Sequence, residues 1–139
     1  MTTWLLDTGP LVAYLDASDK QHQAVCAAWD RFRGRLVTTS AVITEAMHFV
    51  AGSTQGPRYL SDLVSTCQIE VFDLCRPPEL DEAVLLMEHY ADTPMDFADA
   101  TLVLLSEALG IVEILTLDRR GFSTYRTRQG KAMRMVLDG

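Results

Sequence analysis

The sequence predicts an α/β fold in which a parallel β-sheet is covered by helices on both faces. Short apolar runs typical of strands alternate with longer segments of helical periodicity, and this alternation is typical of parallel sheets with helical connections. The chain has 139 residues, of which 48% are hydrophobic and 22% charged, as in an ordinary globular domain. We therefore expect one domain over residues 1–139.

The chain begins with a strand that leads directly into a helix. Residues 4–6 form a short apolar run, and Gly9 then allows a tight turn. Pro10 suits the first position of a helix, because its missing N–H would be unpaired there in any case. We expect a short helix at residues 10–15 and a second at residues 19–32, where apolar residues recur every three to four positions.

The middle of the chain repeats this pattern. Residues 36–38 form the second expected strand, and Ser40 is a suitable cap for a helix that runs to residue 51. A further helix is expected at residues 58–66, after a Gly-Pro pair. Residues 69–74 alternate between apolar and polar side chains, so we expect the third strand there.

Two helices and two strands complete the predicted fold. We expect helices at residues 79–90 and 96–109, and Gly110 is the usual residue to end the second of them. The strands are expected at residues 112–117 and 133–137. Ligands of such sheets bind beyond the carboxyl ends of the strands, so candidate site residues are sought there.

Acidic residues occupy these positions. Asp7 follows the first strand and Asp118 follows the strand at 112–117. Each has an alternative interpretation as a turn or capping residue. Glu45 is the only charged residue in an apolar helix, where a buried carboxylate needs a metal, a hydrogen-bond donor or a positive partner. The alternative is that Glu45 gains only from the helix dipole.

Asp96 and Asp99 open another apolar helix with i, i+3 spacing, which makes them neighbours on its surface. Capping explains Asp96 more readily than Asp99. Carboxylates that converge without basic partners repel one another, and a divalent cation is the simplest compensation. Oxygen ligands without a Cys or His cluster favour Mg²⁺ or Mn²⁺ over zinc. Two such ions ~3.5–4 Å apart are able to activate water and stabilise a leaving oxygen in phosphodiester hydrolysis.

These motifs, in this order, resemble the PIN domain family and specifically its VapC-like toxin ribonucleases. The resemblance covers essentially the whole chain and is carried by Asp7-Thr8-Gly9-Pro10-Leu11, Glu45, Asp99-Ala100, Thr116-Leu117-Asp118 and Gly121-Phe122. It implies a three-layer α/β/α sandwich and an endoribonuclease that depends on Mg²⁺ or Mn²⁺. It also implies an antitoxin protein as partner and, commonly, a homodimer.

The resemblance also implies roles for individual residues. Asp7, Glu45 and Asp99 match the acidic triad of the family. Asp118 matches its more variable fourth acidic position, and Asp96 is an extra carboxylate that is either an outer group or an alternative fourth ligand. The hydroxyls of two threonines, Thr8 and Thr116, are expected to orient carboxylates or bound water, although packing at the strand ends explains them equally well.

Charge is distributed unevenly along the chain. The net charge is −7, yet residues 119–137 contain six basic and no acidic residues. Taken alone, such a run predicts a solvated surface. Because Asp118 directly precedes it, we expect four of its arginines to line the RNA path and hold phosphates, namely Arg119, Arg120, Arg126 and Arg128.

Two other functions remain open from the sequence. One is a catalytically weak PIN-like module that binds RNA or protein, and the other is a DNA-directed nuclease of the flap-endonuclease type. The three cysteines lack a CxxC pair, so we expect reduced thiols in a cytoplasmic protein. No apolar stretch reaches the ~20 residues of a membrane span, and no membrane association is expected.

Overall fold

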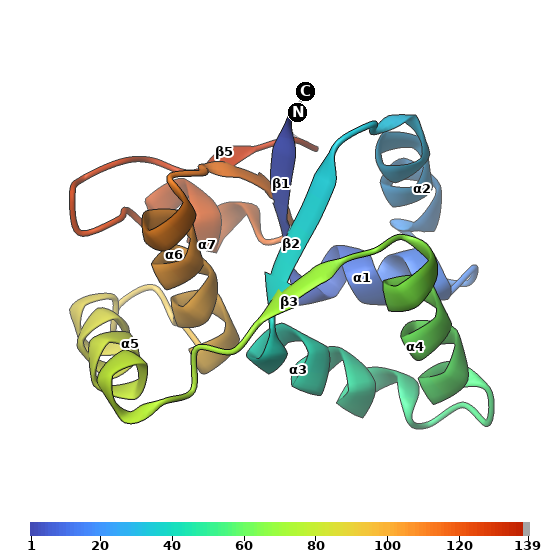
Figure 1. Ribbon diagram of the computed structural model, residues 1–139, viewed down its shortest axis with the longest axis horizontal. Coiled ribbons are helices and arrows are strands. Elements are labelled where there is room, and N and C mark those ends of the chain that lie inside the picture. Colours follow the sequence, from blue (N-terminus) through green and yellow to red (C-terminus); the bar gives the residue numbers. More distant parts are fainter. Residues whose placement is uncertain (138–139) are drawn as a thin grey trace.

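The computed structural model describes residues 1–137. Its centre is a five-stranded sheet of order β3-β2-β1-β4-β5, in which every neighbouring pair is parallel (Figure 1). The strands are β1 (Thr3–Leu6), β2 (Arg35–Thr39), β3 (Glu70–Phe72), β4 (Glu113–Leu115) and β5 (Arg134–Met135). The helices are α1 (Thr8–Leu15), α2 (His22–Arg31), α3 (Ser40–Val50), α4 (Gly56–Thr66), α5 (Pro77–His89), α6 (Phe97–Leu109) and α7 (Arg119–Thr124).

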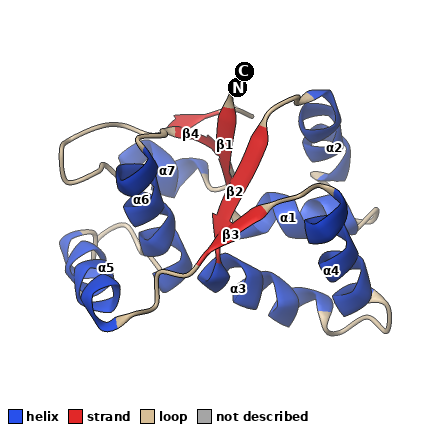
Figure 2. Cartoon of the chain, viewed as in Figure 1, coloured by secondary structure: helices blue, strands red, loops and turns tan. Residues whose placement is uncertain are grey.

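Helices lie on both sides of the sheet, as the sequence predicts. Figure 2 shows the strands in the middle, with α5 and α6 on one side and α2 and α4 on the other. Inner parallel strands that are covered on both faces need continuous apolar runs. Leu5 and Leu6 of β1 meet this requirement, since both are fully buried, and Leu5 is in register with Val37 of β2 and Ile114 of β4.

The parallel arrangement brings the carboxyl ends of all strands to one edge. β1 is the central strand, and Asp7 follows it directly. Its neighbours β2 and β4 end beside it, so the first residues after these strands lie at the same edge. α6 begins near this edge too, because Thr101 in its second turn shares a 2.8 Å hydrogen bond with Thr39 at the end of β2.

The expected element boundaries hold to within a few residues, with one addition. The sequence periodicity did not predict α7, which follows Asp118 and contains Gly121 and Phe122. The helix forms because the Asp118 side chain caps its first turn and because two fully buried rings, Phe122 and Tyr125, anchor its end in the core. The last strand is shorter than expected and consists of Arg134 and Met135 alone.

The predicted end of α6 is confirmed. Gly110 adopts the left-handed conformation, with φ of 69°, and its N–H donates to the Ser106 carbonyl. Most of the helix is buried against the sheet and α5. No helix within residues 1–137 is long and apolar enough to cross a membrane.

Candidate active site

A cavity of about 540 Å³ opens at the carboxyl edge of the sheet and is lined by six carboxylates. They come from the ends of β1 and β4, from α3 and α6, and from the loop after α1. No Lys, Arg or His of the described chain lines this cavity, which we call the acidic pocket. Its carboxylates are Asp7, Asp19, Glu45, Asp96, Asp99 and Asp118.

Asp7 lies at the floor of the acidic pocket and is 6% exposed. It is the N-cap of α1, and its Oδ1 accepts the Thr8 N–H at 2.8 Å. Its Oδ2 accepts the Thr116 hydroxyl at 2.7 Å. Burial raises the pKa of Asp7 to about 6, although these two hydrogen bonds lower it. The carboxylate is therefore held in one orientation and is costly to ionise without a counter-charge.

Asp96 and Asp99 form a reciprocal cap at the start of α6. The Asp99 N–H donates to Asp96 Oδ1 at 2.8 Å, and the Asp96 N–H donates to Asp99 Oδ2 at 3.2 Å. Burial and the charges of Asp96 and Asp7 raise the pKa of Asp99 to about 8. Capping therefore explains both residues locally. The charge of Asp7 contributes to the raised pKa of Asp99, so the carboxylates of the two segments repel one another.

Glu45 faces Thr8 across the interface between α3 and α1. Burial raises the pKa of Glu45, the nearby Thr8 hydroxyl lowers it and Asp96 raises it further. The Thr8 hydroxyl influences this carboxylate without reaching hydrogen-bond geometry, since Thr8 Oγ1 is the one buried side-chain oxygen or nitrogen in residues 1–137 that has no hydrogen-bond partner. An unpartnered hydroxyl among carboxylates indicates a place for a water molecule or ion.

Asp118 lines the pocket and caps α7. Its Oδ1 accepts the Gly121 N–H at 3.0 Å, and its own N–H donates to Thr116 Oγ1 at 3.0 Å. Thr116 therefore joins Asp7 to Asp118 through a single hydroxyl. A Cβ at Gly121 would collide with the Asp118 carboxylate, so this cap requires glycine.

Five lining residues were not among the predicted site residues, namely Gly9, Val12, Asp19, Phe49 and Leu117. Asp19 lies in the loop after α1, Phe49 follows Glu45 by one helical turn, and Val12 follows Thr8 by one helical turn. The four-residue spacing could have pointed to Phe49 and Val12, because residues i and i+4 share a helix face. The sequence offers no comparable signal for Asp19.

The four arginines expected along the RNA path are found in different places. Arg119 and Arg120 are exposed in the first turn of α7, directly after Asp118. Arg126 and Arg128 instead line a second cavity beside α5. The Arg126 guanidinium donates to three carbonyls at the end of α7, and Arg128 pairs with Glu107 at 2.6 Å and Glu82 at 3.1 Å. The last two guanidinium groups therefore hold the chain after α7 in place.

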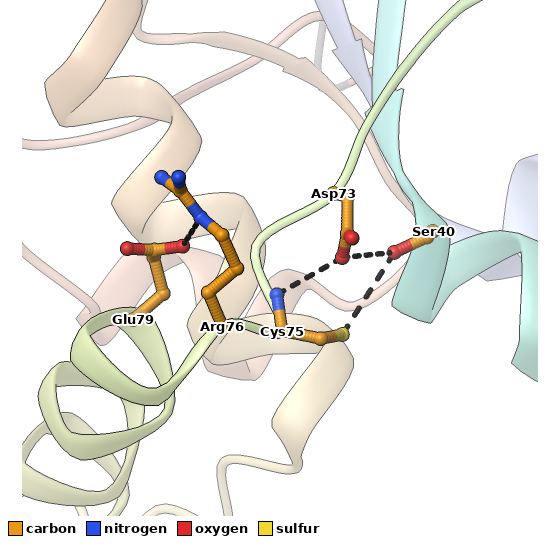
Figure 3. Close-up of polar contacts among 5 residues, drawn as sticks. All are labelled: Ser40, Asp73, Cys75, Arg76 and Glu79. Carbon is orange, nitrogen blue, oxygen red and sulfur yellow. Dashed lines mark hydrogen bonds and ion pairs between the residues drawn. The ribbon is translucent and has the colours of Figure 1, made fainter.

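A separate polar cluster connects β3 to the start of α5 (Figure 3). Ser40 Oγ donates to Asp73 Oδ1 at 3.3 Å and lies 3.8 Å from Cys75 Sγ, and the Cys75 N–H also donates to Asp73. Arg76 pairs with Glu79 at 2.9 Å. None of these residues lines the acidic pocket, and their contacts fix the β3–α5 connection.

The side chains of the acidic pocket match a hard divalent cation in donor chemistry. The ionisable lining groups are all carboxylates, and Thr8 contributes an unpartnered hydroxyl. In this conformation no three His, Cys, Asp or Glu side chains among residues 1–137 are close enough together to hold an ion. Several carboxylate oxygens are instead turned toward N–H groups of their own segments.

The fold and the pocket together define an α/β protein in which carboxylates gather at the carboxyl edge of a parallel sheet. The PIN domain profile matches residues 4–127. The chain is 32% identical to Ribonuclease VapC26 of Mycobacterium tuberculosis over 124 residues, which is 88% of this chain and 91% of that protein. This chain therefore belongs to the PIN domain family, in its VapC ribonuclease branch, and the predicted resemblance is confirmed.

The fold has a solved counterpart. The crystal structure of Mycobacterium tuberculosis VapC20, described as a Sarcin-Ricin loop cleaving toxin, superimposes with a TM-score of 0.73. The match covers 89% of this chain and 96% of VapC20, with 15% sequence identity. It confirms the PIN fold with its central parallel sheet.

Proposed function

We propose that this chain is a metal-dependent endoribonuclease that hydrolyses RNA phosphodiester bonds as the toxin of a toxin–antitoxin pair. The observation that carries the proposal is the acidic pocket, in which six carboxylates meet without a lining cation. Membership in the VapC ribonuclease branch gives the reaction and the toxin role.

Asp7, Glu45 and Asp99 would hold the metal, Mg²⁺ or Mn²⁺. Asp118 or Asp96 would provide a further carboxylate. A divalent cation bound there supplies an activated water and stabilises the charge on the leaving oxygen. Raised pKa values at Asp7 and Asp99 support this assignment, because a cation would restore the ionised forms that burial disfavours.

The protein's own side chains orient the site. Thr116 and the Thr8 N–H hold the Asp7 carboxylate from two directions, so its orientation is set before a metal binds. The buried and unpartnered Thr8 hydroxyl is close enough to Glu45 to lower the pKa of that carboxylate, and we assign it the role of orienting Glu45. Gly121 keeps Asp118 close to the helix start, so that the carboxylate stays at the pocket wall.

Arg119 and Arg120 would bind the RNA backbone. They follow Asp118 in the first turn of α7 and are exposed, whereas the net charge of −7 repels phosphates elsewhere. Contacts of this kind position the backbone without reading bases.

The remaining assignments follow from the family. The whole chain would act as one PIN-like domain and would pair with an antitoxin protein and with a second copy of itself. We assign it to the cytoplasm, which is consistent with three free cysteines in the described chain.

The test is cleavage of labelled single-stranded RNA by purified protein with Mg²⁺, with Mn²⁺ or with EDTA. Asp7→Asn, Glu45→Gln and Asp99→Asn should each abolish cleavage while the protein stays folded, since each keeps shape and removes a negative ligand. Asp81→Asn, an exposed carboxylate of α5 outside the pocket, is the matched control. Cleavage that survives EDTA, or RNA binding without cleavage under every metal condition, would overturn the proposed reaction.

A further inference from the structure

One wall of the acidic pocket is apolar and carries an exposed aromatic ring. Phe49 lines the pocket and is 62% exposed. Tyr59, at 55%, is the other aromatic side chain of the described chain that is exposed to a similar degree, and it lies outside the pocket. The remaining Phe, Tyr and Trp residues are buried or half-buried. Exposure alone is common for single apolar side chains, but Phe49 and Val12 both line the pocket and give it an apolar wall beside the carboxylates.

The position of Phe49 follows from the helices that carry the site. Phe49 is four residues after Glu45 on α3, and Val12 is four residues after Thr8 on α1. Because Thr8 and Glu45 face each other, the next turn of each helix extends the same wall and places Val12 and Phe49 in the pocket. Four residues of α-helix rise about 6 Å. Stacked nucleotides advance about 3.4 Å each, so the ring lies within about two nucleotides of a phosphate held at the carboxylates.

We propose that Phe49 forms a nucleobase subsite, in which its ring stacks on one unpaired base of the RNA next to the cleaved bond. This inference rests on the proposed ribonuclease function. A base is the uncharged, flat part of a nucleotide, so it fits the apolar wall of the pocket, whereas the phosphate would be held through the metal at the carboxylates. Stacking on aromatic rings is the usual way in which proteins hold splayed bases of single-stranded RNA.

Asp19 adds a polar group to the lining of the same pocket. Its Oδ1 accepts the Gln21 N–H at 2.8 Å, and its N–H donates to the Asp16 carbonyl at 3.0 Å, so the loop holds this carboxylate in place. An ionised carboxylate only accepts hydrogen bonds. It therefore favours a base edge with an amino group, such as that of cytosine, over the carbonyl edge of uracil.

The experiment measures the affinity of short labelled single-stranded RNAs in Mg²⁺ buffer, with Asp7→Asn present in every variant to prevent cleavage. Phe49→Ala should weaken binding by about 5- to 150-fold, the range found when a stacking ring is removed. Phe49→Trp should retain affinity, because it keeps a stacking surface. Tyr59→Ala is the matched control and should bind as the parent does.

An abasic scan identifies the stacked base. Removing the base at one RNA position should weaken binding to the parent by the same factor as Phe49→Ala, and should cause no further loss in Phe49→Ala. At that position cytidine should bind about 2- to 12-fold more tightly than uridine, as expected for one hydrogen bond. Asp19→Ala should remove this preference.

Two results would overturn the subsite. If Phe49→Ala and the parent bind every RNA equally, the ring does not contact RNA, and a protein partner becomes the alternative ligand for its exposed face. If Phe49→Ala binds RNA more weakly than the parent, but the two proteins still differ in affinity at every abasic position, the ring contributes to RNA binding without stacking on a base. Failure of the proposed function looks different, since unaltered protein would then fail to cleave RNA with any metal or would cleave it in EDTA, whatever the affinities of the Phe49 variants.

Discussion

Replacing Asp7 by Asn should stabilise the metal-free protein, and the gain should grow with pH. Burial raises the pKa of Asp7 from 3.8 to about 6. The folded state therefore holds the proton up to higher pH than the unfolded chain does. The contribution of this carboxyl to the free energy of unfolding is highest below pH 3.8. It falls as the pH rises through about 6 and stays low above that pH. Asn resembles the protonated carboxyl and carries no charge at any of these pH values, so the variant does not lose this contribution as the pH rises.

The size of the effect follows from the pKa shift. A shift of one pKa unit corresponds to about 1.4 kcal/mol, so the rise to about 6 gives Asp7→Asn an advantage of roughly 2–3 kcal/mol at pH 8. For a chain of this size, that is a melting temperature higher by roughly 5–10 °C. Asp99, whose pKa is raised to about 8, adds a further loss of stability in the same direction at higher pH.

The assay is thermal unfolding in EDTA from pH 5 to pH 9 for the unaltered protein, for Asp7→Asn and for Asp81→Asn. The difference in melting temperature between Asp7→Asn and the unaltered protein should increase as the pH rises from 5 to 8, whereas Asp81→Asn should have the same melting temperature as the unaltered protein. A separation that stays constant over this range would refute the reasoning, because the Asp7 carboxylate would then not be destabilised by burial.

The other predictions concern the metal, the RNA path and the cap at α7. Saturating Mg²⁺ or Mn²⁺ should stabilise the protein by about 2.7 kcal/mol at a hundredfold excess over Kd. Asp99→Asn should raise the melting temperature of the metal-free protein and reduce the stabilisation by metal. Calorimetry with and without metal checks both. Replacing Arg119 and Arg120 by Gln in Asp7→Asn protein should weaken RNA binding similarly for all sequences. The slope of log K against log salt should fall by about 0.7 per lost phosphate contact. An unchanged slope would mean that these arginines only form a solvated surface. Gly121→Ala should displace the Asp118 carboxylate and slow cleavage roughly 10- to 100-fold, while Gly52→Ala, where a Cβ meets nothing, should cleave normally.

The sequence predicted the parallel sheet and the residues at its carboxyl edge because both depend on local patterns. Asp7 and Asp118 each follow an apolar run, and Glu45 interrupts an apolar helix. Five carboxylates selected on these grounds line one cavity. Their roles as ligands stay predictions.

The remaining parts of the site depend on contacts between distant segments. Asp19 reaches the pocket from a loop whose course is set by packing of α1 and α2. Arg128 is drawn away from the pocket by Glu107 and Glu82, which are remote in sequence. α7 was missed because its six residues, Arg119–Thr124, are too few to show a helical apolar periodicity, although a capping role for Asp118 was one of the two interpretations of that residue.

The hydrogen bond between Thr116 and Asp7 spans 109 positions of the chain. During translation, Asp7 leaves the ribosome long before Thr116 and Asp118 have been added. A nascent chain therefore has an Asp7 with no hydroxyl to orient it and a pocket with no far wall. An enzyme directed at RNA is made next to the messenger and ribosomal RNA of its own synthesis, and we expect the nascent chain to be inactive until Thr116 and Asp118 have been added and the domain has folded.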